Sequence, residues 1–192
     1  MRTKINTQYI VRVGLLVAAF VALSVGIHIH LFGHFYVCLG YIAMLVGLVD
    51  MGVTAGAVVG TMGVFLHCLM TGGINEMPGW AIGNLVICLL LGWCIKATQA
   101  EHAGKVFYYV VNSVVLVDSV IVGIIVCKSY VESMLYGQPL IVRVAENSYT
   151  AVADIVVMLV MFPMATELSE AVRKYSFGPM READDQKKST EN

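Results

Sequence analysis

The sequence predicts an all-α membrane protein, a bundle of six transmembrane helices, and three observations lead to this fold class. Of the 192 residues, 58% are hydrophobic and 13% are charged, about half the charged fraction of a typical soluble domain. The mean hydropathy is +0.79. The apolar residues form runs long enough to cross a bilayer, and the basic residues gather in loops that a six-helix arrangement places on one side.

The apolar runs mark the spans. They cover 9–32, 36–70, 79–97, 106–127 and 149–172. Each is close to or above the ~20 residues that a spanning helix needs. The second run is the longest, and LVDMG at 48–52 interrupts it. It could therefore form one long helix or two shorter ones.

The distribution of Lys and Arg decides between these two arrangements. Two helices hinged at Asp50 give six spans, and with the N-terminus inside, ten of the twelve basic residues are cytoplasmic. Only Lys128 and Arg143 then lie outside. One helix gives five spans and a split of five to seven, which the positive-inside rule disfavours. We therefore expect six spans with both termini in the cytoplasm.

The second predicted helix is unusually short. The six predicted helices cover 9–30, 36–49, 51–70, 79–97, 106–128 and 148–172. A helix of about 14 residues measures roughly 21 Å, short for a ~30 Å hydrocarbon core. It must tilt little, thin the bilayer or shelter against its neighbours. Residues 1–175 form a single membrane domain, and the polar segment 176–192 is expected to be a disordered cytoplasmic tail.

Small residues recur at every fourth position of the first span, GLLVAAFVALSVG. Gly14, Ala18 and Ala22 make a shallow groove that lets another helix approach closely. That helix could belong to the same bundle or to another protein, and the motif alone does not distinguish them. In the third predicted helix, small residues are expected to permit tight packing inside the bundle. These are Gly52, Gly56, Gly60 and Gly63.

Two amides inside the spans are candidate ligand contacts. Asn84 lies one turn into the helix 79–97, and Asn112 lies in the helix 106–128. In the expected topology both fall among polar residues that gather toward the outer side. Hydrogen bonding between helices is an equally good explanation for each of them.

Two acids inside the spans are stronger candidates. Asp118 and Asp154 lie on neighbouring predicted helices, and an ionised carboxylate at membrane depth costs about 2.5–3.5 kcal/mol on insertion scales. Such groups normally face a cavity or a partner. The nearest cations are Lys128 and Arg143, at the outer edge and long enough to reach inward. Two carboxylates in one pocket would favour a ligand with cationic or hydrogen-bond-donating groups.

Further candidates lie at the expected mouth of the pocket. Glu76 and Trp80 begin the fourth span, although an interfacial aromatic belt also explains the tryptophan. The segment IHIHLFGHF holds His28, His30 and His34, whose imidazoles suit a transition metal. We favour the alternative that these histidines belong to a loop closing over the pocket. The sequence therefore predicts His30 and His34 as substrate contacts, with no metal or cofactor.

Other function classes lack their signatures. The sequence contains no GxxxxGK[ST] motif, so any ATPase must be another chain. A net charge of −1 gives no indication of nucleic-acid binding. The five cysteines form no CxxC pair and show neither disulfide nor zinc spacing.

Together these features resemble the S component, the substrate-binding subunit of an energy-coupling factor (ECF) transporter. The resemblance covers roughly residues 8–175. It depends on the small-residue motif of the first helix, then LGYIAMLVGLVDMGVTAGAVVGTMG, then PGWAIGNLVICLLLG, in this order and spacing.

The resemblance implies a division of labour in a prokaryotic cytoplasmic membrane. The S component is not an enzyme but captures a vitamin or related micronutrient from outside. A transmembrane T component grips the face formed by Gly14, Ala18 and Ala22, and two ABC-type ATPases supply energy. The capture site is expected in the loop after the first helix and the outer parts of helices four to six. The sequence shows no clear match to the pocket motifs of riboflavin, thiamine, biotin or nickel/cobalt members, which leaves folate, pantothenate, pyridoxamine or queuosine-precursor types open.

Two alternatives belong to other classes. An intramembrane aspartyl protease would use Asp118 and Asp154 as a pair, but the surrounding LVDSV and VADIV do not match the GxGD-type motif of those families. A stand-alone channel or carrier would be favoured by inverted repeats, and 9–97 shows no convincing symmetry with 106–172.

Overall fold

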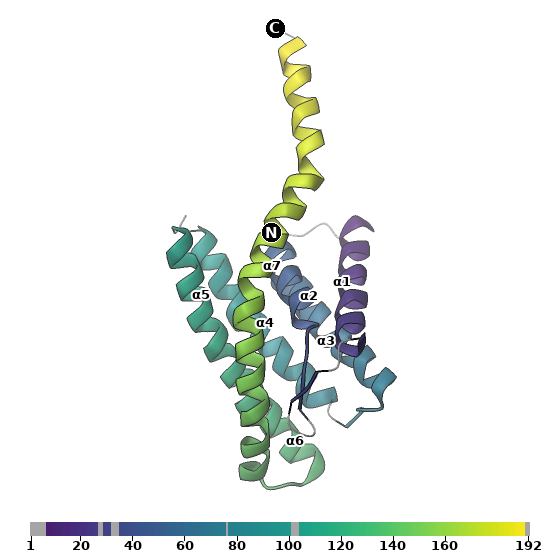
Figure 1. Ribbon diagram of the computed structural model, residues 1–192, viewed down its shortest axis with the longest axis vertical. Helices are drawn as coiled ribbons and strands as arrows, with labels where there is room; N and C mark the ends of the chain where they lie inside the picture. Colours follow the sequence, from purple (N-terminus) through teal and green to yellow (C-terminus); the bar gives the residue numbers. More distant parts are fainter. Residues whose placement is uncertain (1–6, 27–28, 32–34, 76, 101–103, 191–192) are drawn as a thin grey trace.

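The computed structural model describes residues 7–26, 29–31, 35–75, 77–100 and 104–190. It is a helical bundle with one short pair of antiparallel strands (Figure 1). The elements are α1 (Thr7–Gly26), β1 (Ile29–Leu31), β2 (Phe35–Val37), α2 (Tyr41–Val46), η1 (Gly47–Met51), α3 (Val53–Thr71), α4 (Met77–Ala100), α5 (Lys105–Val120), η2 (Ile121–Lys128), α6 (Ser129–Tyr136) and α7 (Leu140–Thr190). The segments η1 and η2 are π-helical, with wider turns than an α-helix.

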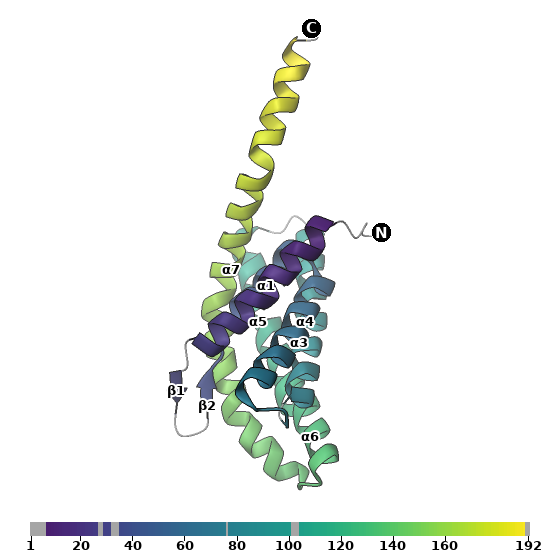
Figure 2. The same cartoon turned by 90° about the vertical axis from the view of Figure 1, so that its right-hand side faces the viewer.

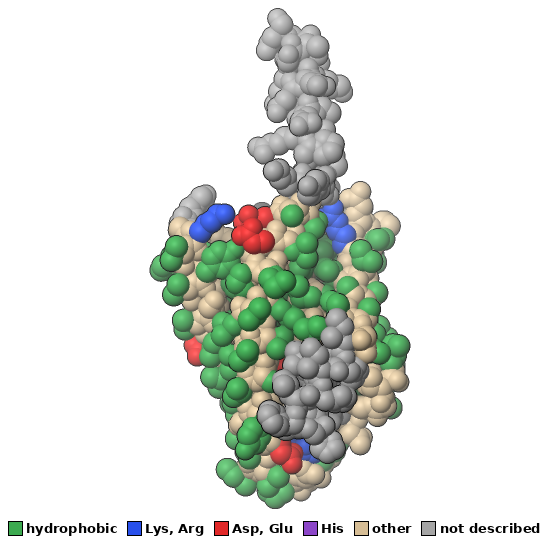
Figure 3. Space-filling model, in the orientation of Figure 1, with side chains coloured by type: hydrophobic (Ala, Val, Ile, Leu, Met, Phe, Trp, Pro, Cys, Tyr) green, Lys and Arg blue, Asp and Glu red, His purple; other side chains and the backbone are tan. Residues whose placement is uncertain are grey.

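Five helices are long and apolar enough to cross a membrane. They are Thr7–Gly26, Val53–Thr71, Met77–Gln99, Lys105–Tyr136 and Leu140–Val172. A shorter apolar helix, Tyr41–Met51, joins them. Hydrophobic side chains cover most of the face in Figure 3, with charged groups mainly near its two ends. The structure thus confirms the predicted class of fold, an all-helical, multi-pass membrane protein.

The short second helix differs from its predicted bounds. It was expected at 36–49 but begins at Tyr41, because Phe35–Val37 pairs with Ile29–Leu31 in an antiparallel ladder. The chain breaks at Gly52, two residues after the expected hinge at Asp50. Gly52 has φ 93° and ψ −177°, a combination that is essentially restricted to glycine.

Three of the four glycines that were predicted to permit tight packing do so, whereas Gly52 precedes α3 and a Cβ there would meet no atom within 4 Å. A Cβ at Gly56 would lie 2.8 Å from the Leu48 Cβ, and one at Gly60 would lie 2.6 Å from the Met44 sulfur. A Cβ at Gly63 would overlap the Phe20 ring. These three positions therefore let η1, α2 and α1 approach α3 closely.

The bundle has two distinct ends. In Figures 1 and 2, α1 begins and α7 leaves the bundle at one end, which we name the terminal end, whereas the strands and α6 lie toward the other, the α6 end. The same views place α1 and α5 on opposite sides of the bundle.

The last helix extends beyond the bundle. Helix α7 continues to Thr190, so the segment 176–192, expected to be disordered, is helical as far as that residue. The helix continues although the segment contains Gly178 and Pro179, which are the poorest helix formers.

Candidate functional site

Three buried side chains meet toward the α6 end of the bundle. The Tyr41 hydroxyl donates a hydrogen bond to Asp154 Oδ2 at 3.0 Å. The indole Nε1 of Trp80 donates to the Tyr41 oxygen, also at 3.0 Å. Trp80 also packs edge-on against His67, with 5.5 Å between the ring centroids. All four side chains are buried, so α2, α3, α4 and α7 converge on one polar point in an apolar bundle.

A second buried group lies beside the first and carries opposite charges. Glu132 is only 2% exposed, and its carboxylate lies 3.8 Å from Lys128 Nζ and 3.8 Å from Arg143 Nη1. The Asn147 amide donates to Glu132 Oε2 and to Ser129 Oγ, each at 3.0 Å. Lys128 and Arg143, which the sequence analysis described as long enough to reach inward, both lie beside this buried carboxylate.

Lys128 connects the two groups. It interacts electrostatically with the carboxylate of Asp154 as well as with Glu132. We name the combined set the polar centre. Its members are Tyr41, Trp80, Lys128, Glu132, Arg143, Asn147 and Asp154.

Glycines bring the helices of the polar centre close together. A Cβ at Gly123 would lie 2.7 Å from the Gly83 carbonyl oxygen, so η2 and α4 approach backbone to backbone. A Cβ at Gly79 would lie 2.8 Å from the Glu132 Cγ. These contacts place Trp80 of α4 beside the end of η2, where Lys128 stands.

The charges of the polar centre compensate one another. Lys128 and Arg143 supply two cations, and Glu132 and Asp154 supply two acids. Together with the aromatic rings of Tyr41 and Trp80, this environment offers hydrogen-bond donors, acceptors and flat apolar surface without excess charge. In the described part of the chain, no three His, Cys, Asp or Glu side chains are grouped to hold a metal ion.

The two predicted amides both make hydrogen bonds within the bundle. Asn84 is fully buried and donates to the Gly60 carbonyl at 3.1 Å, which fits hydrogen bonding between helices. Asn112 donates to Thr98 Oγ1 at 3.0 Å and to the Tyr108 carbonyl at 2.7 Å. Thr98 lies close to the C-terminal end of α4, away from Trp80 at its start. The structure therefore does not bring Asn112 to the polar centre.

The structure corrects the prediction that Asp118 and Asp154 lie together in one pocket. Its side chain is exposed on α5, whereas the next residue, Ser119, is fully buried. Successive residues of a helix point about 100° apart, and here the bundle covers Ser119 but not Asp118. Asp118 and Asp154 do not share a pocket, and the protease alternative loses its paired carboxylates.

Three further predicted contacts lie outside the described residues. Glu76 is one of them, and the side chains of His30 and His34 are the others. Sequence reasoning also missed Tyr41, Glu132 and Asn147. Spacing could have indicated the last two, since Glu132 follows Lys128 by one helical turn and Asn147 precedes Asp154 by two turns on one face.

The small-residue face of α1 is open. Gly14, Ala18 and Ala22 are all exposed, and a Cβ at Gly14 would meet no atom within 4 Å. Helix α1 packs on the bundle through Val13, Phe20 and other residues of its opposite face. Packing within this chain therefore does not account for the motif.

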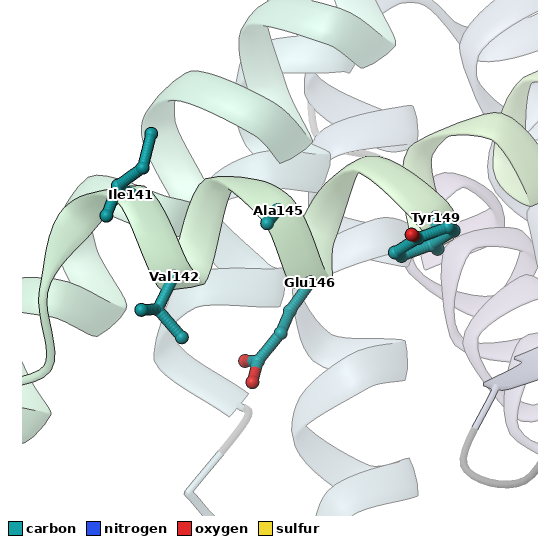
Figure 4. A pocket seen from close by; sticks show the side chains of 5 residues that line it. All are labelled: Ile141, Val142, Ala145, Glu146 and Tyr149. Carbon is teal, nitrogen blue, oxygen red and sulfur yellow. The ribbon is translucent and has the colours of Figure 1, made fainter.

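A shallow depression lies on the outside of α7. It is lined by Ile141, Val142, Ala145, Glu146 and Tyr149, all on one helix (Figure 4). Glu146 accepts a hydrogen bond from Arg143 at 3.1 Å. The depression is an exposed helix surface and forms no part of the polar centre.

A multi-pass helical bundle with a buried polar centre toward one end and an open helix-docking face is typical of a membrane transport subunit. The family model "ECF-type riboflavin transporter, S component" matches residues 4–173, and the chain belongs to that family. No curated protein and no solved structure matched it. The prediction of an S component is confirmed. The family consists of transporter subunits for vitamin uptake and not of enzymes. The sequence analysis found no match to riboflavin members of the family. The match to a riboflavin family model makes riboflavin a candidate substrate again.

Proposed function

We propose that this chain captures riboflavin, or a neutral planar heterocycle of the same kind, at the polar centre. The observation that carries the proposal is the hydrogen-bonded set of Tyr41, Trp80 and Asp154 beside the ion-paired Lys128. Polar side chains inside a membrane bundle are costly and normally mark a substrate pathway. Family membership supports a vitamin as the substrate.

Charge compensation favours a neutral ligand. A carboxylate such as folate or pantothenate would need a cation without a partner, but Lys128 and Arg143 both lie beside Glu132. An amine such as pyridoxamine would need an unpaired acid, but Asp154 already has Tyr41 and Lys128. A flavin ring needs only donors, acceptors and aromatic contact, which the polar centre offers.

The proposed topology has six membrane crossings with both termini in the cytoplasm. Two observations support it: α1 begins and α7 leaves the bundle at the same end, and ten of the twelve basic residues fall on the inner side. The helix Tyr41–Met51 measures about 16 Å and spans only part of the core, sheltered against α3 and α7. The polar centre then lies toward the outer side of a prokaryotic cytoplasmic membrane.

The partners follow from the open face of α1. We expect a transmembrane T component to dock on Gly14, Ala18 and Ala22, where small residues allow helices to approach. Two ABC-type ATPases would supply the energy, since this chain carries no nucleotide-binding motif. A stand-alone carrier would instead take up its substrate in cells that lack those three subunits, and uptake assays with and without them separate the two.

Riboflavin titration of the detergent-purified chain tests the ligand, with flavin fluorescence as the readout. Asp154→Asn removes a charged hydrogen-bond acceptor, and such bonds contribute about 1.5–3 kcal/mol. We therefore expect roughly 10- to 150-fold weaker binding. Asp118→Asn is the matched control, because that carboxylate is exposed on α5.

Either of two results would contradict the proposal. Equal weakening by both variants would show that the effect does not come from the polar centre. A wild-type chain that fails to bind riboflavin, but releases another small molecule in native mass spectrometry, would replace the substrate.

A further inference from the structure

Asp118 lies at the middle of a membrane-spanning helix. The span Lys105–Tyr136 runs without a break through α5, η2 and α6, and Asp118 is 13 residues from its first residue and 18 from its last. At about 1.5 Å per residue, these separations are roughly 20 Å and 27 Å along the axis. The carboxylate therefore lies well inside a ~30 Å hydrocarbon core, away from both ends of the span.

The face that carries Asp118 is exposed and otherwise apolar. Val110 and Val114 precede it at intervals of four residues and are each 57% exposed. Val122 and Val126 follow at the same interval and are 38% and 56% exposed. We name these five residues the α5 face. The opposite side of α5 packs into the bundle through Asn112, Leu116, Ser119 and Val120.

Nothing in the described part of this chain compensates the carboxylate. No described side chain donates a hydrogen bond to Asp118 or forms an ion pair with it. A long Lys or Arg side chain can reach the interface from within a bilayer, but an aspartate is too short to do so. Ionisable side chains within spans normally pair or face a cavity, and Asp118 does neither here.

We propose that the α5 face binds a transmembrane helix of a different protein that presents a basic side chain at the depth of Asp118. A second copy of this chain does not fit, because it would set one Asp118 against another at the same depth. The chain also has no Lys or Arg between Lys105 and Lys128 to offer in return. Charge complementarity therefore requires a partner with its own cation.

The α5 face is separate from the docking face of α1. The two helices lie on opposite sides of the bundle in both views (Figures 1 and 2). A partner on the α5 face leaves Gly14, Ala18 and Ala22 free. The inference therefore goes beyond the proposed function and does not depend on which vitamin is bound.

Energy transfer in phosphatidylcholine vesicles tests the inference with the full chain and synthetic polyleucine helices. The probe helices carry Lys, Leu or Glu at their central position. We expect the Lys probe to bind at least tenfold more tightly than the Leu probe, and the Glu probe no more tightly than the Leu probe. Asp118→Leu should abolish the difference, whereas the control Val114→Leu on the same face should retain it.

Three results would overturn the inference. The first is equal binding of the Lys and Leu probes to the wild-type chain. The second is a Lys preference that persists in Asp118→Leu, with the variant unfolding at the wild-type temperature. The third is energy transfer between labelled copies of this chain that Asp118→Leu removes, which would assign the α5 face to self-association.

Discussion

The same substitution at two glycines should separate internal packing from docking. Gly63→Leu and Gly14→Leu each place leucine in the middle of an apolar helix, so the change in helix propensity is the same in both. A Cβ at Gly63 would overlap the Phe20 ring, which is fully buried between α1 and α3, whereas a Cβ at Gly14 meets nothing within 4 Å. Overpacking a filled core costs about 1–3 kcal/mol, and only Gly63→Leu should incur it.

The assay has two readouts. Unfolding of each purified variant in one detergent should show Gly63→Leu less stable than Gly14→Leu by about 1–3 kcal/mol. Co-purification with the T component should show the reverse order, with Gly14→Leu weakening assembly at least tenfold because leucine fills the groove. Val160→Leu, exposed on α7 and outside both the α1 face and the α5 face, is the control that should leave both readouts unchanged.

Two outcomes would refute this reasoning. If Gly14→Leu destabilises the isolated chain as much as Gly63→Leu, the small-residue face is packed inside the bundle after all. If Gly14→Leu assembles with the T component as well as Val160→Leu does, the α1 face is not the docking surface.

Three further substitutions test the polar centre and the helix break. Tyr41→Phe leaves Asp154 Oδ2 and Trp80 Nε1 without the Tyr41 hydroxyl as a partner. Each unsatisfied buried group costs about 1–3 kcal/mol, so chemical unfolding should show a loss of roughly 2–6 kcal/mol. An unchanged free energy of unfolding would mean that these hydrogen bonds are absent. Glu132→Leu removes the carboxylate beside Lys128, and since breaking a buried pair costs about 3–5 kcal/mol, the unfolding midpoint should fall clearly, with the exposed Glu146→Leu as the control. Gly52→Ala should lower the free energy of unfolding by about 1–3 kcal/mol through backbone strain at φ 93°, although the added Cβ would meet no atom within 4 Å. A variant as stable as the wild-type chain would show that the helix break tolerates a side chain.

The sequence predicted the five long spans, but the helix expected at 106–128 continues to Tyr136 and the one expected at 148–172 begins at Leu140. It predicted the second helix poorly. Long apolar runs identify membrane helices because any spanning segment must satisfy its backbone internally and face lipid. The start of α2 at Tyr41 depended on the pairing of Ile29–Leu31 with Phe35–Val37, a contact between segments that hydropathy does not report. The break fell at Gly52 because only glycine adopts that backbone conformation readily.

The site was predicted in part. Asp154 was identified because a carboxylate in an apolar run is unusual, and Trp80 because it begins the fourth span at the expected mouth of the pocket. The structure joins them through Tyr41. Glu132 and Asn147 were missed since they lie near the end of a span, where polar residues are ordinary. Asp118 met the same criterion as Asp154 yet lies on the exposed side of its helix.

The sequence by itself determined the class of protein, the number of long apolar helices and the small-residue motif of α1. These features follow from composition and local spacing, which determine directly how each segment partitions between water and lipid. Only the tertiary structure decided which face of each helix turns inward. In a membrane both the lipid and the bundle interior are apolar, so hydrophobic periodicity is weak and the facing of Asp118, Asp154 and Gly14 depends on how the helices pack.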